Sequence, residues 1–256
     1  MTAPMLPTDL VRVPGERARR LESALRLRRS GLGRRARHDL DRVEAFRERL
    51  LADDREIEVI EYGAGHKTER RTPEEMAAGR VTHGFVHEIC KRASSRPAKA
   101  LLLYALVREF APRRALELGT CLGISAAYQA MAIRHAGEGG QLTTLEGAPA
   151  MAEIARETFA AAGLDNVDVR VGRFVDTMPV VLAEGPVGYA FVDGHHDGQA
   201  TLDYFEEILP HAPDALLVFD DIRWNDRMEA AWHRIAADDR IELAVDLQEY
   251  GLVLTR

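Results

Sequence analysis

From Arg114 onward, short apolar runs alternate with helical segments, and this alternation restricts the possible folds more than any other feature of the chain. It predicts a doubly wound α/β fold, in which crossover helices join parallel strands. We expect strands at 115–119, 141–145, 167–171, 189–193, 215–220, 241–247 and 251–255. Only three residues separate the last two strands, too few for a crossover helix, so these strands should pair antiparallel. The sequence therefore predicts a seven-stranded, mostly parallel sheet that ends in an antiparallel C-terminal hairpin.

Residues 1–93 follow a different pattern, and we expect them to form a helical N-terminal extension of a domain spanning 94–256. Apolar residues at helical spacing within 15–53 predict one or two amphipathic helices, interrupted around 30–33. Residues 56–62 look extended. Thr72, followed by proline and two glutamates, is typical of a helix start, and a strongly apolar helix is expected over 98–110. The expected role of the extension is oligomerisation or covering the substrate, with 61–66 as a candidate lid loop.

The charge of the chain is unevenly distributed. The formal net charge is -7, which argues against nucleic acid as the main partner. Between Val11 and Arg37, however, the chain contains ten arginines and only two acidic residues. This segment could bind an acidic partner, RNA or a membrane surface. Because apolar residues recur among the charges, the favoured interpretation is a solvated amphipathic helix at a homodimer interface.

Several classes of protein are disfavoured by what the sequence lacks. Cys90 and Cys121 belong to no Cys-x-x-Cys or Cys/His cluster, so no zinc or redox site is expected. No stretch approaches the roughly 20 apolar residues of a membrane helix, and the N-terminus does not resemble a secretory signal. We therefore expect a cytoplasmic protein without a membrane partner.

The most informative motif is Leu116-Glu-Leu-Gly-Thr-Cys-Leu-Gly-Ile-Ser125, which leaves a predicted strand and enters an apolar helix. Its glycines let a ligand approach the backbone, and the helix N-terminus offers N–H groups to an anion or carboxylate. Glu146 ends the next strand, where it can accept hydrogen bonds from a ribose diol. An NAD-binding protein would place an acid there too, but the turn lacks the Gly-x-Gly-x-x-Gly spacing that a pyrophosphate favours. A structural turn without a ligand is the remaining alternative.

The pattern Glu-x-Gly-x-x-x-Gly-x-Ser, from Glu117 to Ser125, resembles motif I of class I S-adenosylmethionine (SAM)-dependent methyltransferases. It is particularly similar to the family of catechol and caffeoyl-CoA O-methyltransferases, over residues 94–256. The resemblance implies a Rossmann-like fold and SAM as cofactor, with the methionine portion at Gly119 and Ser125, the ribose at Glu146 and the adenine near 172–175. The cofactor-binding residues that it implies are Glu117, Gly119, Thr120, Gly123, Ser125, Glu146, Gly172, Arg173, Phe174 and Asp193.

Asp193, Asp220 and Asp221 follow two apolar strands, so they should emerge together at the carboxyl edge of the sheet. Converging carboxylates repel unless one is protonated, a basic partner lies nearby or a metal binds. Oxygen ligands select hard ions such as Mg²⁺, Mn²⁺ or Ca²⁺. The catechol O-methyltransferase pattern implies that these three aspartates bind Mg²⁺ or Mn²⁺, although that pattern has Asp-Asn where this chain has Asp220-Asp221. Helix capping or solvation without a metal is the alternative.

His196 lies three residues after Asp193, where the family has its catalytic lysine. A histidine can accept a hydroxyl proton near neutral pH, so His196 is the candidate catalytic base. It could also be a metal ligand, or it could cap the helix expected near Gln199 together with its neighbours. Trp224 could line a substrate pocket or pack in the core. The segment 94–97 borders the site in this family, although no direct role is predicted for it.

The expected reaction is transfer of the SAM methyl group to a hydroxyl oxygen of a small molecule, assisted by a divalent metal. A metal-independent methyltransferase acting on nitrogen or RNA would use the same SAM-binding residues, and it is one alternative. An aminopropyltransferase-like enzyme using decarboxylated SAM, and a non-enzymatic interaction protein on an inactive methyltransferase fold, are further alternatives. The acceptor itself cannot be identified, because loops form its pocket.

Overall fold

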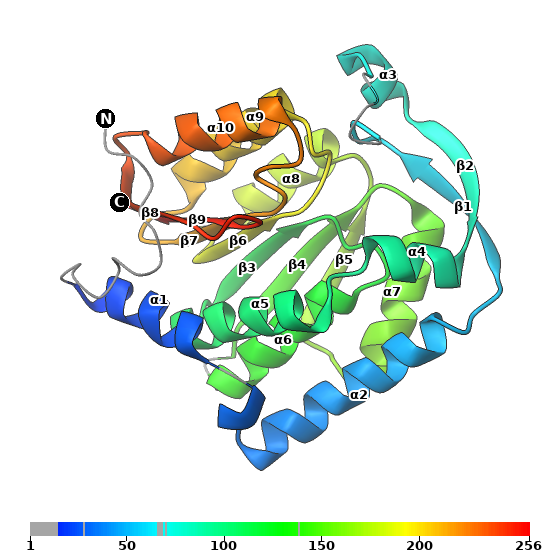
Figure 1. Cartoon of the computed structure of the whole chain (residues 1–256), viewed down its shortest axis with the longest axis horizontal. Helices are drawn as coiled ribbons and strands as arrows, with labels where there is room; N and C mark the ends of the chain where they lie inside the picture. Colours follow the sequence, from blue (N-terminus) through cyan, green and yellow to red (C-terminus); the bar gives the residue numbers. More distant parts are fainter. Residues whose placement is uncertain (1–14, 28, 66–68, 70, 138) are drawn as a thin grey trace.

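The computed structural model describes residues 15–27, 29–65, 69, 71–137 and 139–256. A seven-stranded sheet lies between two layers of helices, which confirms the predicted α/β architecture (Figure 1). The strand order is β5-β4-β3-β6-β7-β9-β8, and only the pairings of β9 with β7 and β8 are antiparallel. The strands are β3 Arg114–Leu118, β4 Gln141–Glu146, β5 Val167–Val171, β6 Tyr189–Val192, β7 Leu216–Phe219, β8 Ile241–Asp246 and β9 Gly251–Thr255.

The two helical layers explain why the central strands are apolar throughout. Every residue of β6 and β7 is buried, as expected for strands covered on both faces. On one face lie α5 Pro97–Phe110, α6 Ile124–Ala136 and α7 Pro149–Ala162, and on the other lie α8 Phe174–Ala183, α9 Gly198–Ile208 and α10 Asp226–Ala236, with the short helix η3 Leu209–His211 after α9. No helix among the described residues is long and apolar enough to span a membrane.

The N-terminal region contains the two predicted amphipathic helices and also a small sheet. Its elements are α1 Glu16–Arg26, η2 Arg29–Gly31, α2 Arg34–Leu50, β1 Glu56–Glu61, α3 Pro73–Ala78, β2 Arg80–Phe85 and α4 Val86–Ala93. The helix start at Thr72 is confirmed, with a capping box to Glu75. The extended segment predicted at 56–62 is confirmed as β1, and it pairs antiparallel with β2, which was not predicted. Strand β2 has no buried residue, so no apolar alternation marks it in the sequence.

The N-terminal helices share one hydrophobic core with the sheet domain. Leu21 of α1 and Leu40 of α2 are buried in the same cluster as Leu103 of α5. Arg17 donates a hydrogen bond to the backbone oxygen of Thr255, at 2.8 Å, so α1 also contacts the last strand. The division at residue 93 stays a prediction, but the core is continuous across it.

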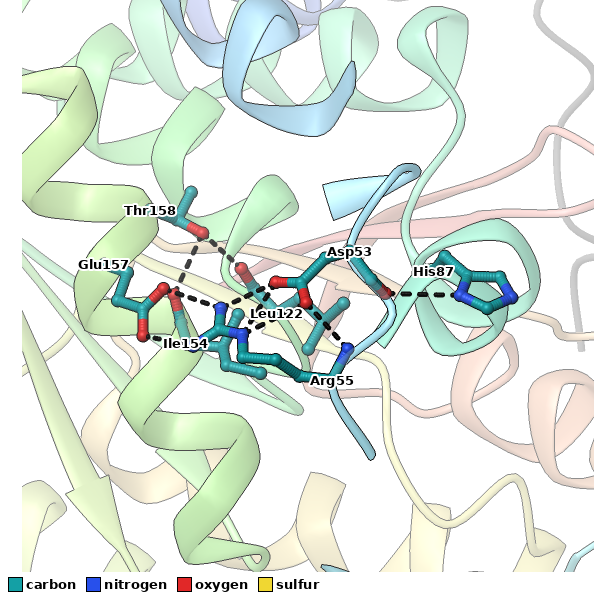
Figure 2. Close-up of polar contacts among 7 residues, drawn as sticks. All are labelled: Asp53, Arg55, His87, Leu122, Ile154, Glu157 and Thr158. Carbon is teal, nitrogen blue, oxygen red and sulfur yellow. Dashed lines mark hydrogen bonds and ion pairs between the residues drawn. The ribbon is translucent and has the colours of Figure 1, made fainter. Parts of the chain in front are cut away.

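The start of β1 is attached to α7 by the contacts of Arg55, which Figure 2 shows. Its two terminal nitrogens reach the two carboxylate oxygens of Glu157 at 3.0 and 2.9 Å, while its Nε contacts Asp53. An exposed ion pair contributes little to stability, but the two-pronged geometry fixes the relative orientation of the Arg55 and Glu157 side chains. Nearby, the buried hydroxyl of Thr158 on α7 donates to the Leu122 backbone oxygen at 2.7 Å. Helix α7 therefore contacts both the small sheet and the turn after β3.

Candidate active site

A cavity of about 910 Å³ opens at the carboxyl ends of β3, β4, β6 and β7. Doubly wound sheets bind their ligands at this edge. The loops after these strands form one wall, and β1, β2 and the connection from α4 to α5 form another. The volume lies at the upper end of the roughly 300–1,000 Å³ range of ligand pockets, which suits a cofactor together with a small acceptor.

The glycine-rich turn after β3 brings the backbone close to the cavity. The N–H groups of Gly119 and Thr120 both donate to the Leu145 backbone oxygen, at 3.0 and 3.1 Å. Gly119 has φ +103°, and an added Cβ atom would lie 2.1 Å from the Asp193 backbone oxygen. Only glycine fits this position, because both the conformation and the close approach exclude a side chain.

Glu146 lies at the end of β4, lines the cavity and is only 6% exposed. Its Oε2 accepts from the Cys121 backbone N–H at 2.8 Å, and its Oε1 accepts from the Ala148 N–H at 2.9 Å. Burial raises the pKa of Glu146 to about 7, against the opposing effect of these backbone hydrogen bonds. The carboxylate is held in one orientation, with lone pairs left to accept further hydrogen bonds.

All ten predicted cofactor residues belong to the described part of the chain. Six of them line the cavity, and four do not. The six are Gly119, Glu146, Gly172, Arg173, Phe174 and Asp193. The four are Glu117, Thr120, Gly123 and Ser125. Glu117 is fully buried and accepts from Gln129 Nε2 at 2.7 Å and from Thr144 Oγ1 at 2.6 Å. This geometry favours support of the turn over contact with the cofactor.

Glu117→Gln is expected to change how stability depends on pH. Burial raises the pKa of Glu117 to about 7 in the folded protein, from an ordinary value of 4.5. The folded state therefore binds more protons than the unfolded state between these values, and the free energy of unfolding falls as pH rises through this window. The loss amounts to about 3 kcal/mol by pH 8. Urea unfolding at pH 5 and pH 8 should show this loss reduced in Glu117→Gln. An identical pH dependence in both proteins would contradict the assignment.

The three predicted aspartates line the same cavity after β6 and β7, together with a lysine. The Nζ atom of Lys99 lies 2.9 Å from Asp220 Oδ1 and 3.7 Å from Asp221 Oδ1. Burial raises the pKa of Asp193 well above its usual range, and the charges of the other two aspartates add to this. Burial alone would lower the pKa of Lys99, but the charge and hydrogen bond of Asp220, together with the charges of Asp221 and Glu249, raise the pKa above its ordinary value. Lys99 is therefore an ammonium ion.

Sequence analysis did not identify Lys99 as a site residue. It was assigned to a strongly apolar helix, and 121 positions separate it from Asp220. The available signal was a lysine in the first turn of that helix, directly after the segment 94–97. Ser94, Ser95 and Arg96 from this segment also line the cavity.

His196 lines the cavity beside the aspartates. Its Nε2 lies 3.8 Å from Asp193 Oδ1, and its ring centroid lies 5.5 Å from that of Trp224. Asp197 alone caps α9, accepting from the N–H groups of Gln199 and Ala200. His196 is therefore free of the capping role that the sequence left open. Trp224 also lines the cavity.

Strained backbone concentrates at this site. Five residues other than glycine have positive φ values and line the cavity, namely Cys121 (50°), His195 (63°), His196 (48°), Asp221 (50°) and Gln248 (73°). Such conformations each cost on the order of 1–3 kcal/mol and are enriched at functional sites.

The segment after β1 forms the wall opposite the sheet. Tyr62 packs against Gly147, where an added Cβ would lie 2.6 Å from the tyrosine ring. The Ala64 N–H donates to the His195 backbone oxygen at 2.7 Å. The candidate lid loop thus contacts the site between 61 and 65, while His66 lies outside the described residues. Tyr62 was predicted only as part of that candidate lid loop, without a contact to Gly147.

Known proteins resemble parts of this chain. Residues 116–222 match the family model of a methyltransferase domain. A probable O-methyltransferase of Mycobacterium tuberculosis is 30% identical over 184 residues, which cover 68% of this chain and 75% of that protein. A catechol O-methyltransferase of the same bacterium is 38% identical over 112 residues. That match covers 43% of this chain and only 48% of the relative, about half its length.

Solved structures show the same similarity. An O-methyltransferase from Bacillus cereus in complex with SAH has a TM-score of 0.56 and 25% identity, covering 64% of this chain and 84% of that one. The O-methyltransferase TomG from Streptomyces achromogenes, in complex with SAM, has a TM-score of 0.55 and 25% identity, covering 64% and 82%. The family-model match, residues 116–222, contains the glycine-rich turn after β3 and the strands β4 to β7.

Proposed function

Because this chain belongs to the family of class I SAM-dependent O-methyltransferases, we propose that it transfers a methyl group to a hydroxyl oxygen of a small molecule. The observation that carries this proposal is that one cavity has a β4 end and a β7 end: Glu146 ends β4 and Asp220 follows β7, with β3 and β6 between these strands. Glu146 and the Gly119 turn lie at the end suited to the cofactor. His196, Lys99 and the aspartates lie at the end suited to the acceptor.

When bound, SAM supplies a methyl group made electrophilic by its sulfonium. Glu146 would orient the ribose, and the open backbone at Gly119 would let the methionine portion approach. His196 would accept the proton of the acceptor hydroxyl as the new carbon–oxygen bond forms and the carbon–sulfur bond breaks. The protein's main contribution is alignment of donor and acceptor, which can supply roughly 7–11 kcal/mol of the barrier reduction.

The metal-assisted form of this reaction stays a prediction. Asp193, Asp220 and Asp221 would have to hold the ion, but these side chains as they stand do not fit it. The Lys99 ammonium already contacts Asp220 and lies near Asp221. Among the described residues, no three His, Cys, Asp or Glu side chains come together as a metal site. We therefore derive no step through a metal. The homodimer and the cytoplasmic location also stay predictions.

The test combines SAM titration calorimetry with methyl transfer from labelled SAM to a panel of catechols and other hydroxylated compounds. We expect SAM binding and product with at least one acceptor. His196→Ala should lower turnover by about 100-fold while the Kd of SAM changes by less than about 3-fold. His233→Ala, an exposed histidine on α10, serves as the matched control and should behave like the wild type.

Two outcomes would contradict these assignments. A wild-type protein that does not bind SAM would reject the proposed activity. Equal losses of turnover and SAM affinity in His196→Ala would reject its role as the base and indicate a structural one.

A further inference from the structure

Lys99 gives the acceptor end of the cavity a positive charge of its own. Besides its contacts with Asp220 and Asp221, the Nζ atom lies 3.5 Å from Glu249 Oε2 and 4.9 Å from the centroid of the Tyr250 ring. Three carboxylates and an aromatic face therefore surround one ammonium group. This is the environment of a bound cation, and the cation is a side chain of the protein.

The fold holds this lysine in place. Lys99 lies in the first turn of α5, which starts at Pro97. The next turns bury Ala100 and Leu103 completely in the core, so the helix cannot shift without opening the core. The Lys99 side chain is 20% exposed, and its residue lines the cavity. It can thus reach a ligand while keeping its contacts with the acidic pair.

A divalent ion and the Lys99 ammonium would compete for the same oxygens. Asp220 is only 8% exposed at its side chain, and its Oδ1 accepts from both Lys99 and the Asp221 backbone N–H. Arg223, which also lines the cavity, forms a two-pronged ion pair with Asp246, with both nitrogen–oxygen distances at 3.0 Å. Lys99, by contrast, lies within 4 Å of both members of the acidic pair.

We propose that the Lys99 ammonium takes the place that a divalent metal would have, so that acceptor binding and methyl transfer need no metal. In this arrangement, an Nζ–H donates to the acceptor oxygen, favours its anionic form and lets His196 take the proton. Such a donor stabilises the charge that develops on the oxygen. The catalytic part of this inference rests on the proposed O-methyl transfer.

The first experiment needs neither an acceptor nor turnover. Mn²⁺ is titrated into the full chain, and free Mn²⁺ is followed by electron paramagnetic resonance. We expect the wild type to leave the signal unchanged up to about millimolar Mn²⁺. Lys99→Met, which keeps the apolar stem but removes the charge, should bind one Mn²⁺. Adding Asp220→Asn to that variant should abolish the binding. Stoichiometric Mn²⁺ binding by the wild type, or none by a Lys99→Met protein that still binds SAM, would overturn the inference.

The second experiment measures methyl transfer in EDTA and with added Mn²⁺. The wild type should keep its rate within about 2-fold in EDTA, whereas Lys99→Met should lose about 100-fold and recover part of it with Mn²⁺. Lys91→Met, an exposed lysine in the last turn of α4, should match the wild type. A wild type that loses activity in EDTA and regains it with Mg²⁺, or a fully active Lys99→Met, would overturn the inference. If no acceptor is methylated at all, the proposed function fails, while the Mn²⁺ titration still decides the role of Lys99.

Discussion

Glu146→Ala is expected to weaken SAM binding by at least about 100-fold. The carboxylate would accept two ribose hydroxyls, and hydrogen bonds to a charged group contribute roughly 1.5–3 kcal/mol each. Its loss also leaves the backbone N–H groups of Cys121 and Ala148 without their acceptor. Titration calorimetry measures the effect. Glu153→Ala removes an exposed acid from α7 and should leave the Kd of SAM unchanged. An unaltered Kd in Glu146→Ala would show that the ribose binds elsewhere.

The same carboxyl group should make SAM binding depend on pH. The pKa of Glu146 is raised to about 7 by burial, and only the ionised form offers both oxygens as acceptors. Binding at pH 6 therefore requires loss of a proton, and affinity should be about 10-fold lower there than at pH 8. Glu146→Gln should lack this component, so its comparison with the wild type separates the carboxyl group from other titrating groups. Parallel pH profiles for the two proteins would reject this explanation.

Gly119→Ala is expected to lower the free energy of unfolding by at least about 3 kcal/mol and to abolish SAM binding. The new Cβ would lie 2.1 Å from the Asp193 backbone oxygen, so the turn after β3 or the loop after β6 must move. Gly137→Ala is the matched control. Gly137 also has a positive φ, of +80°, but among the described residues nothing lies within 4 Å of an added Cβ. Gly137→Ala should lower the free energy of unfolding by only about 1 kcal/mol. Urea unfolding and calorimetry would distinguish the two, and equal costs would show that the close approach is relieved without penalty.

The sequence predicted the sheet well because its signals are local. The central strands β6 and β7 are short apolar runs, and the three-residue connection from 248 to 250 was enough to predict the antiparallel end. Strand β2 was missed because it has no buried apolar face. It is stabilised by its pairing with β1, which the local sequence does not reveal. The pairing partner, and not the composition, determines this strand.

The site was predicted less completely, for two physical reasons. Contacts between distant segments leave no local pattern, so Lys99 beside Asp220 and Tyr62 beside Gly147 were not foreseen. Side-chain direction also depends on packing. Glu117 belongs to the glycine-rich motif, yet its side chain lies under α6 against Gln129 and not in the cavity.

The contact between α1 and the last strand affects the order in which the molecule can fold during synthesis. Leu21 has its partners in the core formed with α5, and Arg17 bonds to Thr255, 238 positions later. The first helices therefore leave the ribosome long before the surfaces that bury them exist. The contacts of α1 are complete only when β9 has been made, so the nascent chain exposes apolar helix faces at least until the helices that cover them follow. Chaperones that bind such faces would act on this protein at residues 16–50, the earliest helices described.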